Sequence, residues 1–344
     1  MTGTPGLQLS TTPALHYLIA GQGLAGTIFA LLAAKRGRTV QVVDPEEPVT
    51  CSRVAAGLMN PISGPRLSLG EQEEAFWFAA RDFYREWETV LGVRFFEERP
   101  ILRLFTDAEQ AERWKKREAD PRYAPWYEAL PPEWERRAVF GGFATKRCGR
   151  LDAVAFLDAA REWLRGRGAF RTGRVDEGAA RGTTVWCLGH ESRVQGPFRE
   201  VPVRPARGTI LTIRAPAFRE PEIVHAGKWL VPFGDDLYRV GSTYEWEPGD
   251  ALPSPESRAE LSAFLDGFLP GPWELVQEDA GIRPMANRGR PFLARHPHRP
   301  GDVLFNGLGS RGSLLAPWFA ARLLDHLEDG AALDPEVDAG RFLL

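Results

Sequence analysis

The sequence predicts an α/β protein, α+β overall, with a Rossmann-like nucleotide-binding domain and an inserted domain built on an antiparallel sheet. Three observations predict this fold. A strand, a glycine-rich turn, a helix and a second strand follow one another over residues 17–44. A second glycine-rich turn, at residues 307–312, precedes a long apolar helix near the C-terminus. Between them, residues 204–246 alternate apolar and polar side chains in strand-like runs.

The composition is typical of a globular protein with two domains. With 344 residues, 43% of them hydrophobic, the chain can bury a large core, and domains average roughly 150 residues. The net charge of −3 argues against an overall basic surface for nucleic acid or membranes, although a local basic groove stays open. Without a basic leader or an apolar run of about 20 residues, we expect a cytoplasmic protein.

The three cysteines give no sign of a metal site. Cys51, Cys148 and Cys187 are widely spaced and form no CxxC or Cys/His pattern. This usage is typical of a reducing compartment, and we expect no metal ligands among them.

The first glycine loop has the context of a dinucleotide fingerprint. The strand at residues 17–20 leads into Gly21, Gly23 and Gly26, and a helix is expected over residues 24–35. The first glycine permits the turn and the second admits a pyrophosphate at the helix N-terminus. The third lets helix and strand pack closely, and Leu24 and Ala25 are expected at the phosphate with these glycines.

Asp44 follows the second expected strand, at residues 39–43. A carboxylate at this place accepts hydrogen bonds from the ribose hydroxyls of an adenine nucleotide. It also disfavours a 2′-phosphate, so the sequence favours FAD or NAD over NADP.

The second glycine loop repeats the G-x-G-x-x-G spacing at Gly307, Gly309 and Gly312. A strand is expected at residues 302–306, and Ser313 is the expected N-cap of the following helix, which tolerates Pro317 in its first turn. No further strand or carboxylate follows at the usual spacing. We therefore expect both loops to hold one ligand, with the second facing its reactive ring; the alternative is a glycine turn before an ordinary helix. A helix N-terminus stabilises the negative charge of a reduced flavin, which favours FAD over NAD.

At this point the chain resembles the D-amino-acid oxidase and glycine oxidase superfamily of FAD-dependent amine oxidases. Five separated stretches carry the resemblance. They are IAGQGLAG with VVD, SRVAAGLMNP at 52–61, residues 151–192, KWLVPFGDDLYRVGSTYE at 228–245, and AGIRPMANRGRPFLARHP followed by NGLGSRGSLLAP. The chain is also similar to the oxidase half of the bacterial bifunctional enzyme that finishes methylaminomethyl-thiouridine in tRNA.

The resemblance implies a discontinuous FAD-binding domain and an inserted substrate domain. The first is expected at residues 14–70, 146–203 and 277–344, and the second at 71–145 and 204–276. We also expect noncovalent FAD, because no cysteine of this sequence lies in a motif for covalent flavin attachment. The residues so implied to bind FAD, beyond those of the first loop and Asp44, are Ala55, Ala56, Gly57, Met59, Val175, Gly189, Gly307, Gly309, Ser310, Arg311, Gly312 and Ser313.

Oxidation of an amine by FAD needs the substrate C–H bond aimed at flavin N5 and the amine in its neutral form. Hydride transfer then gives an imine that water hydrolyses, and dioxygen reoxidises the flavin with release of peroxide. Arg283 in AGIRP matches the family's carboxylate-binding arginine, whose guanidinium grips a carboxylate in a bidentate fork. Trp229 stands where the family often has a tyrosine, and it walls the pocket without accepting a hydrogen bond. Tyr244, His225 and Arg311 are the candidates to take that tyrosine's role.

The expected function is therefore an FAD-dependent oxidase of a small amine or amino acid of the glycine, D-amino acid or N-substituted glycine type. One alternative is an oxidase of the carboxymethylaminomethyl group of a modified tRNA wobble uridine, which Arg283 would serve equally. The others are an NAD-dependent dehydrogenase and a non-catalytic flavoprotein. The sequence leaves the exact substrate, its stereochemistry, the electron acceptor and the oligomeric state open.

Overall fold

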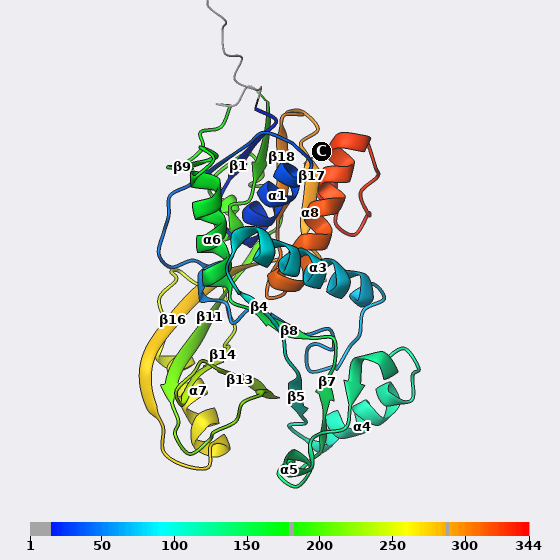
Figure 1. Ribbon diagram of the computed structural model, residues 1–344, viewed down its shortest axis with the longest axis vertical. Helices are drawn as coiled ribbons and strands as arrows, with labels where there is room; N and C mark the ends of the chain where they lie inside the picture. Colours follow the sequence, from blue (N-terminus) through cyan, green and yellow to red (C-terminus); the bar gives the residue numbers. More distant parts are fainter. Residues whose placement is uncertain (1–14, 179–181, 287–288, 344) are drawn as a thin grey trace, which may run out of the picture.

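The computed structural model describes residues 15–178, 182–286 and 289–343 (Figure 1). Residues 14 and 344, at the ends of the expected FAD-binding domain, and residues 287–288 in the AGIRP stretch lie outside the described residues. Within the described ranges, no helix is long and apolar enough to cross a membrane.

One domain is built on a six-stranded sheet in the order β17-β18-β10-β1-β2-β9. Five of its strands run parallel, and β17 pairs antiparallel with β18 at one edge. The strands are β1 (Tyr17–Ala20), β2 (Val40–Asp44), β9 (Phe170–Thr172), β10 (Thr183–Trp186), β17 (Phe292–Arg295) and β18 (Asp302–Asn306). Both β1 and β10 are central and almost fully buried, as expected of strands covered on both faces. The predicted Rossmann-like domain is confirmed.

Helices cover this sheet and share its largest hydrophobic core. Figure 1 shows α1 and α8 side by side near the sheet, with α6 to one side and α3 crossing below them. The helices are α1 (Leu24–Lys35), α3 (Glu73–Leu91), α6 (Ala153–Arg165) and α8 (Gly312–Asp329). Their fully buried members include Ile28, Phe76, Phe156 and Leu323. This packing fixes the N-termini of α1 and α8 relative to each other.

The second domain is built on a nine-stranded sheet in the order β15-β11-β14-β13-β12-β5-β7-β6, with β16 also paired to β11. All neighbours are antiparallel except the parallel pair of β5 and β12. The strands are β5 (Ile101–Leu104), β6 (Tyr127–Glu128), β7 (Gly142–Thr145), β11 (Arg204–Arg214), β12 (Ile223–Ala226), β13 (Lys228–Pro232), β14 (Leu237–Gly241), β15 (Glu245–Trp246) and β16 (Glu274–Met285). One face packs on α7 (Pro255–Phe268), through Leu261 and Leu265.

Smaller elements connect the two domains. A three-stranded sheet in the order β3-β8-β4 joins β3 (Leu58–Met59), β8 (Gly149–Leu151) and β4 (Phe96–Glu98). The other α-helices of the described chain are α2 (Cys51–Val54), α4 (Ala108–Glu118) and α5 (Pro132–Glu135), of which α2 and α5 are short. Thr50 caps α2 by accepting a hydrogen bond from the backbone N–H of Arg53.

The expected division into a discontinuous FAD-binding domain and an insert remains a proposal, and the structure refines two of its limits. Helix α3, assigned to the insert, shares the hydrophobic core of α1, α6 and α8. Strand β16 crosses the expected boundary at residue 277 and pairs with β11 along its whole length. The sheet of the second domain therefore continues as far as Met285.

The N-terminus of α8 differs from the prediction. Ser313 was the expected N-cap, but the helix begins at Gly312 and Arg311 is the N-cap residue. Helix α3 also contacts the first turn of α8. The buried Tyr84 hydroxyl donates a hydrogen bond to the carbonyl of Ser313 over 2.8 Å. In a regular helix this carbonyl would accept from residue 317, which is a proline without an N–H. Tyr84 thus supplies the hydrogen bond that Pro317 cannot give.

We predict that Tyr84→Phe lowers the free energy of unfolding by about 1–3 kcal/mol, because it leaves a buried carbonyl without a donor. Denaturant unfolding of the variant measures the loss. In the background of Pro317→Ala, whose backbone N–H restores the helical bond, the same substitution is expected to cost less. An equal cost in both backgrounds would contradict this assignment.

Candidate active site

One long cavity runs between the two domains and contains most of the residues predicted to bind a ligand. Both glycine loops, the C-terminal ends of β2 and β10, and one face of the nine-stranded sheet line it. Asp44 and Val175 lie in its nucleotide end, and Trp229, Tyr244 and Arg283 lie in its sheet end. A ligand in this cavity would therefore contact both ends of the chain.

The first glycine loop has the predicted geometry. Gly26 faces the strand so closely that a Cβ there would lie 1.9 Å from the carbonyl oxygen of Gly21, which explains the third glycine of the motif. The carboxylate of Asp44 accepts from the backbone N–H of Gln22 over 2.6 Å. Its other oxygen accepts from the backbone N–H of Glu46 over 2.7 Å, and the residue lines the cavity at the turn between β1 and α1.

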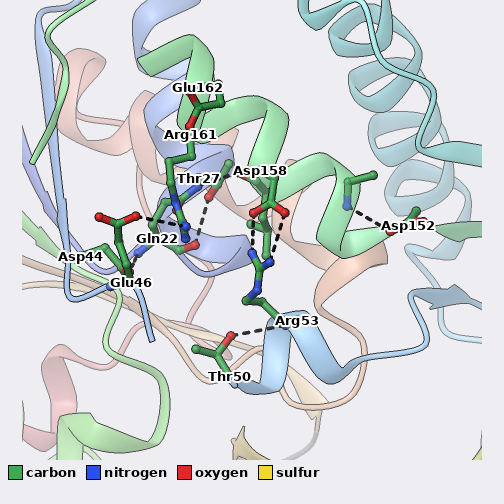
Figure 2. Close-up of polar contacts among 12 residues, drawn as sticks. Gln22, Thr27, Asp44, Glu46, Thr50, Arg53, Asp152, Asp158, Arg161 and Glu162 are labelled. Atoms are coloured by element: carbon green, nitrogen blue, oxygen red, sulfur yellow. Dashed lines mark hydrogen bonds and ion pairs between the residues drawn. The ribbon is translucent and has the colours of Figure 1, made fainter. Parts of the chain in front are cut away.

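Side chains from α2 and α6 brace this loop (Figure 2). The Gln22 amide donates to the carbonyl of Leu157 and accepts from Arg161 Nε over 2.6 Å. Arg53 forms a two-pronged ion pair with Asp158, with oxygen distances of 2.6 and 3.1 Å. That pair holds the pKa of the Asp158 carboxyl below its usual value. The brace fixes α2 beside the N-terminus of α1.

The second glycine loop is tied to the strand that carries Arg283. The backbone N–H of Gly309 donates to the carbonyl of Pro284 over 3.0 Å. The Asn306 side chain donates to the carbonyl of Gly189 over 2.7 Å, and its oxygen accepts from the N–H of Gly307. The loop therefore lies between the end of β10 and the sheet end of the cavity.

The two helix N-termini converge on this cavity. A Cβ at Gly312 would lie 3.2 Å from Leu24 Cδ1, so the first turns of α8 and α1 are in contact. In the described chain neither N-cap residue, Gly23 or Arg311, caps its helix with its own side chain. The N–H of Leu24 is bonded to Ser52 Oγ, and the other first-turn N–H groups and the positive helix ends remain for the anionic oxygens of a ligand.

Arg283 projects from β16 over the neighbouring strand. Its guanidinium donates to Ser242 Oγ over 2.7 Å and to the carbonyl of Thr243 over 3.3 Å, and it lies 4.4 Å from the centroid of the Tyr244 ring. No carboxylate among the described residues forms an ion pair with it, and burial lowers its pKa from the usual value. The site therefore holds a cation that is solvated by neutral groups and faces an open cavity.

Gly208 makes room for this arrangement. It lies on β11, two residues after Ala206, which is directly opposite Arg283 on β16. A Cβ at Gly208 would lie 1.9 Å from Arg283 Nη2. Any other residue would push the guanidinium out of its place.

The other three catalytic candidates have distinct settings. Trp229 lines the cavity from β13, with its ring over Gly241 of the neighbouring strand. Tyr244 is 49% exposed and stacks on Arg283. Arg311 also lines the cavity, but its guanidinium is paired over 2.5 Å with the buried carboxylate of Glu73. Arg311 is therefore neutralised within the protein, and we assign it to anchoring the second loop rather than to gripping a substrate.

Most of the predicted FAD-binding positions line the cavity, and three do not. Met59 is fully buried in the hydrophobic core, because alternation along β3 turns its neighbour Leu58 to the cavity instead. Gly26 serves packing, and Gly307 supports the second loop from behind. Val175 reaches the cavity from the loop after β9 rather than from a strand. The predicted residues on the cavity are Gly21, Gly23, Leu24, Ala25, Asp44, Ala55, Ala56, Gly57, Val175, Gly189, Gly309, Ser310, Arg311, Gly312 and Ser313.

Sequence reasoning missed several lining residues. Ser52 accepts a hydrogen bond from the backbone N–H of Leu24 over 3.2 Å, and Arg174 lies at the nucleotide end, paired with Glu47 and Glu191. Ser52 lies within the stretch SRVAAG that carried the resemblance, so this signal was present in the sequence. Ser242 likewise lies within the stretch at 228–245, whereas Gly208 had no such signal, because only the pairing of β11 with β16 brings it to Arg283.

The cysteines have no redox or metal arrangement in the described chain. All three are free thiols, and burial raises their pKa values. Within the described ranges, no three His, Cys, Asp or Glu side chains are grouped as a metal site requires.

The fold and the cavity are those of a dinucleotide-binding protein in which two helix N-termini and an arginine line the site. A family model described as "FAD dependent oxidoreductase" matches residues 16–327. The chain belongs to this family, and it is an FAD-dependent enzyme of the amine and amino-acid oxidase type. This sets aside the NAD-dependent and non-catalytic alternatives.

Individual relatives agree with this assignment. The chain is 27% identical over 362 residues to glycine oxidase from Pseudomonas aeruginosa, covering 94% of this chain and 97% of the relative. It is 27% identical over 159 residues to the tRNA 5-methylaminomethyl-2-thiouridine biosynthesis bifunctional protein of Marinobacter nauticus, covering 42% of this chain and 25% of that protein. The crystal structure of glycine oxidase from Geobacillus kaustophilus superposes with a TM-score of 0.76 at 20% identity, covering 95% of this chain and 98% of that one. The last comparison shows the shared fold.

The residues of the cavity fit FAD. The carboxylate at the end of β2 suits the ribose, the N-terminus of α1 suits the pyrophosphate, and the N-terminus of α8 suits the polar edge of a flavin. The close packing at Gly26 holds α1 against β1 for this purpose.

We predict noncovalent binding: acid precipitation of the yellow protein is expected to leave all visible flavin absorbance in the supernatant. Absorbance retained in the pellet after washing would show a covalent link.

A further prediction concerns the clearance around Arg283. Gly208→Ala is expected to weaken the binding of acetate or glycolate about ten- to hundredfold, because the guanidinium must move and each charge-assisted hydrogen bond contributes about 1.5–3 kcal/mol. Titration of the FAD-loaded protein, followed by the change in flavin absorbance, measures this affinity. Gly249→Ala is the matched control, since a Cβ there meets nothing within 4 Å. Equal affinities in the two variants would contradict the assignment.

Proposed function

We propose that the protein oxidises a small primary or secondary amine that bears a carboxylate, of the glycine, D-amino acid or N-substituted glycine type. The products are the imine, which water hydrolyses, and hydrogen peroxide from dioxygen. The single observation that supports this best is the Arg283 guanidinium, which has no ion-pair partner among the described residues and faces the cavity beside the second glycine loop.

Arg283 would orient the substrate. A carboxylate bound in its fork is held at two points, which fixes the direction of the Cα–H bond and of the amine. Because Ser242 and Thr243 hold the guanidinium from behind, its position is set before the substrate arrives. Binding then costs little further ordering of the protein.

Bound FAD would supply the two-electron oxidant for the C–H bond next to the amine nitrogen. The chain's contribution is positioning, because the Gly309–Pro284 hydrogen bond places the second loop next to the carboxylate clamp. The Trp229 ring closes one side of the cavity with an apolar wall, which excludes water from the reacting bond and favours the neutral amine. No described side chain is needed as a strong base in this scheme.

The wobble-uridine alternative uses the same clamp, because a carboxymethylaminomethyl group is itself an N-substituted glycine. It is tested with the same FAD-loaded protein by comparing free N-methylglycine with tRNA that carries this group. Reduction by the tRNA alone would favour the alternative.

We predict that Arg283→Met lowers kcat/KM for the best amino-acid substrate about a hundredfold or more, since it removes a bidentate charged contact of about 3 kcal/mol. Anaerobic loss of the visible flavin absorbance, measured across a panel of glycine, N-methylglycine and both enantiomers of alanine and proline, gives the rates. Arg283→Lys is expected to recover only part of the loss, because an ammonium is a point charge without the planar fork.

Two results would count against the proposal. One is full activity in Arg283→Met with unchanged FAD content. The other is an FAD-loaded wild type that no carboxylate-bearing amine reduces.

A further inference from the structure

A buried carboxylate lies directly behind the second glycine loop. Glu73 is the first residue of α3 and is only 3% exposed. One of its oxygens lies 2.5 Å from Nη2 of Arg311, the N-cap residue of α8. Because Arg311 lines the cavity, this ion pair has its cation at the site and its anion in the protein interior.

The position of Arg311 is electrostatically unfavourable by itself. The N-terminus of a helix carries about half a positive charge, which stabilises anions and repels cations. Arg311 adds a full positive charge at this end of α8, and its Nε is buried without a hydrogen-bond partner. Among the described residues, Glu73 is the carboxylate that pairs with it. The guanidinium therefore depends on Glu73 for its compensating charge.

Glu73, in contrast, is well placed to be an anion. It lies in the first turn of α3, where the positive helix end favours a carboxylate. Gly70 leaves room for it, since a Cβ at that position would lie 2.7 Å from Glu73 Oε1. A buried carboxylate is costly without a partner, and here the helix end and the guanidinium compensate it. The fold thus fixes a negative charge behind the second glycine loop.

This charge bears on the flavin because reduction places negative charge on the ring. In the predicted arrangement the ring lies against residues 307–312, where the N-terminus of α8 stabilises that charge. With Glu73 present the ion pair is neutral, and about half a positive charge of the helix end remains; without Glu73, about one and a half would remain. The acidic residues that line the cavity, Asp44, Glu47 and Glu191, lie at its nucleotide end.

We propose that Glu73 lowers the reduction potential of the bound flavin by neutralising Arg311. This inference rests on the proposed function and adds to it a positioning residue, which acts on the flavin through Arg311 without touching it. A lower potential makes the oxidation of the amine less favourable. It makes the transfer of two electrons and two protons to dioxygen, which gives hydrogen peroxide, more favourable.

The test measures the reduction potential of FAD bound to the protein, by slow anaerobic reduction with dithionite beside a reference dye of known potential. Glu73→Gln keeps the size of the side chain and an oxygen acceptor for Arg311, and it removes the negative charge. At a fixed potential, the ratio of reduced to oxidised flavin is expected to rise about tenfold or more. A tenfold rise corresponds to about 30 mV for a two-electron couple.

A double variant separates the effect of charge from that of structure. Glu73→Gln combined with Arg311→Met removes both charges, so the ratio is expected to return close to that of the wild type. Structural damage would instead accumulate in the double variant. FAD content and denaturant unfolding report folding in every variant.

Glu328→Gln is the matched control. Glu328 is also largely buried and pairs with Arg38 over 2.8 Å, but it lies at the C-terminal end of α8, about 24 Å along the helix from its first residue. Its ratio is expected to equal that of the wild type. If Glu73→Gln does not retain FAD, Gly70→Ala takes its place, because its Cβ displaces the carboxylate from Arg311 and should shift the ratio in the same direction.

The outcomes separate this inference from the proposed function. An unchanged ratio in the Glu73 variant, or in its Gly70 substitute, would overturn the role of Glu73 and leave the oxidase assignment intact. An equal shift in the single and double variants would also overturn it, since the shift would then be structural. Failure of every amine to reduce the wild-type flavin would overturn the proposed function, while the potentials, which are measured without a substrate, would still decide the role of Glu73.

Discussion

The constraint on which the site depends is a guanidinium that lies in a cavity and has no carboxylate beside it among the described residues. Within that part of the chain, a hydroxyl, a carbonyl and an aromatic ring hold Arg283. Its charge costs free energy that these neutral groups offset only in part, and in the function we propose an anionic substrate supplies the rest. The surrounding structure accommodates this charge through Gly208, which leaves the space, and through β16, which carries the arginine beside the second glycine loop.

That loop explains why the chain has two fingerprints. The first behaves as local sequence rules say, because strand, turn, helix and acid follow within thirty residues and fold as one unit. The second has the glycine spacing of a fingerprint but not its context, since no strand follows it in the described residues up to 343. Its function comes from the contacts of α8 with α1 and α3, and from the hydrogen bond to Pro284. The cavity thus offers one dinucleotide a helix N-terminus at each of two places.

The part of the fold that the sequence predicted is the local part. Residues 17–20, 24–35 and 302–306 form the expected strand, helix and strand, because periodicity and glycine turns determine them. The errors arose where a distant element decides. Ser313 is not the N-cap, because α8 begins at Gly312 and its N-cap residue is Arg311, which pairs with Glu73 of α3. Met59 is in the core, because the pairing of β3 with the distant β8 turns its side chain away from the cavity.

The substrate end of the site was accessible from sequence only through the resemblance. Arg283 and Trp229 were predicted from matching stretches, whereas the role of Gly208 and the contact between Arg103 and His225 depend on which strands pair in the sheet. Arg103 and His225 lie 122 residues apart, and no periodicity relates them. Strand register is long-range information, and the structure supplies it.

The most direct test of the account is a crystal structure of the FAD-loaded protein with a bound carboxylate such as glycolate. The account predicts a single FAD per chain, with its adenosine ribose at Asp44, its flavin ring against residues 307–312, and the carboxylate in the fork of Arg283. A flavin ring remote from the second glycine loop, or a carboxylate bound away from Arg283, would contradict it.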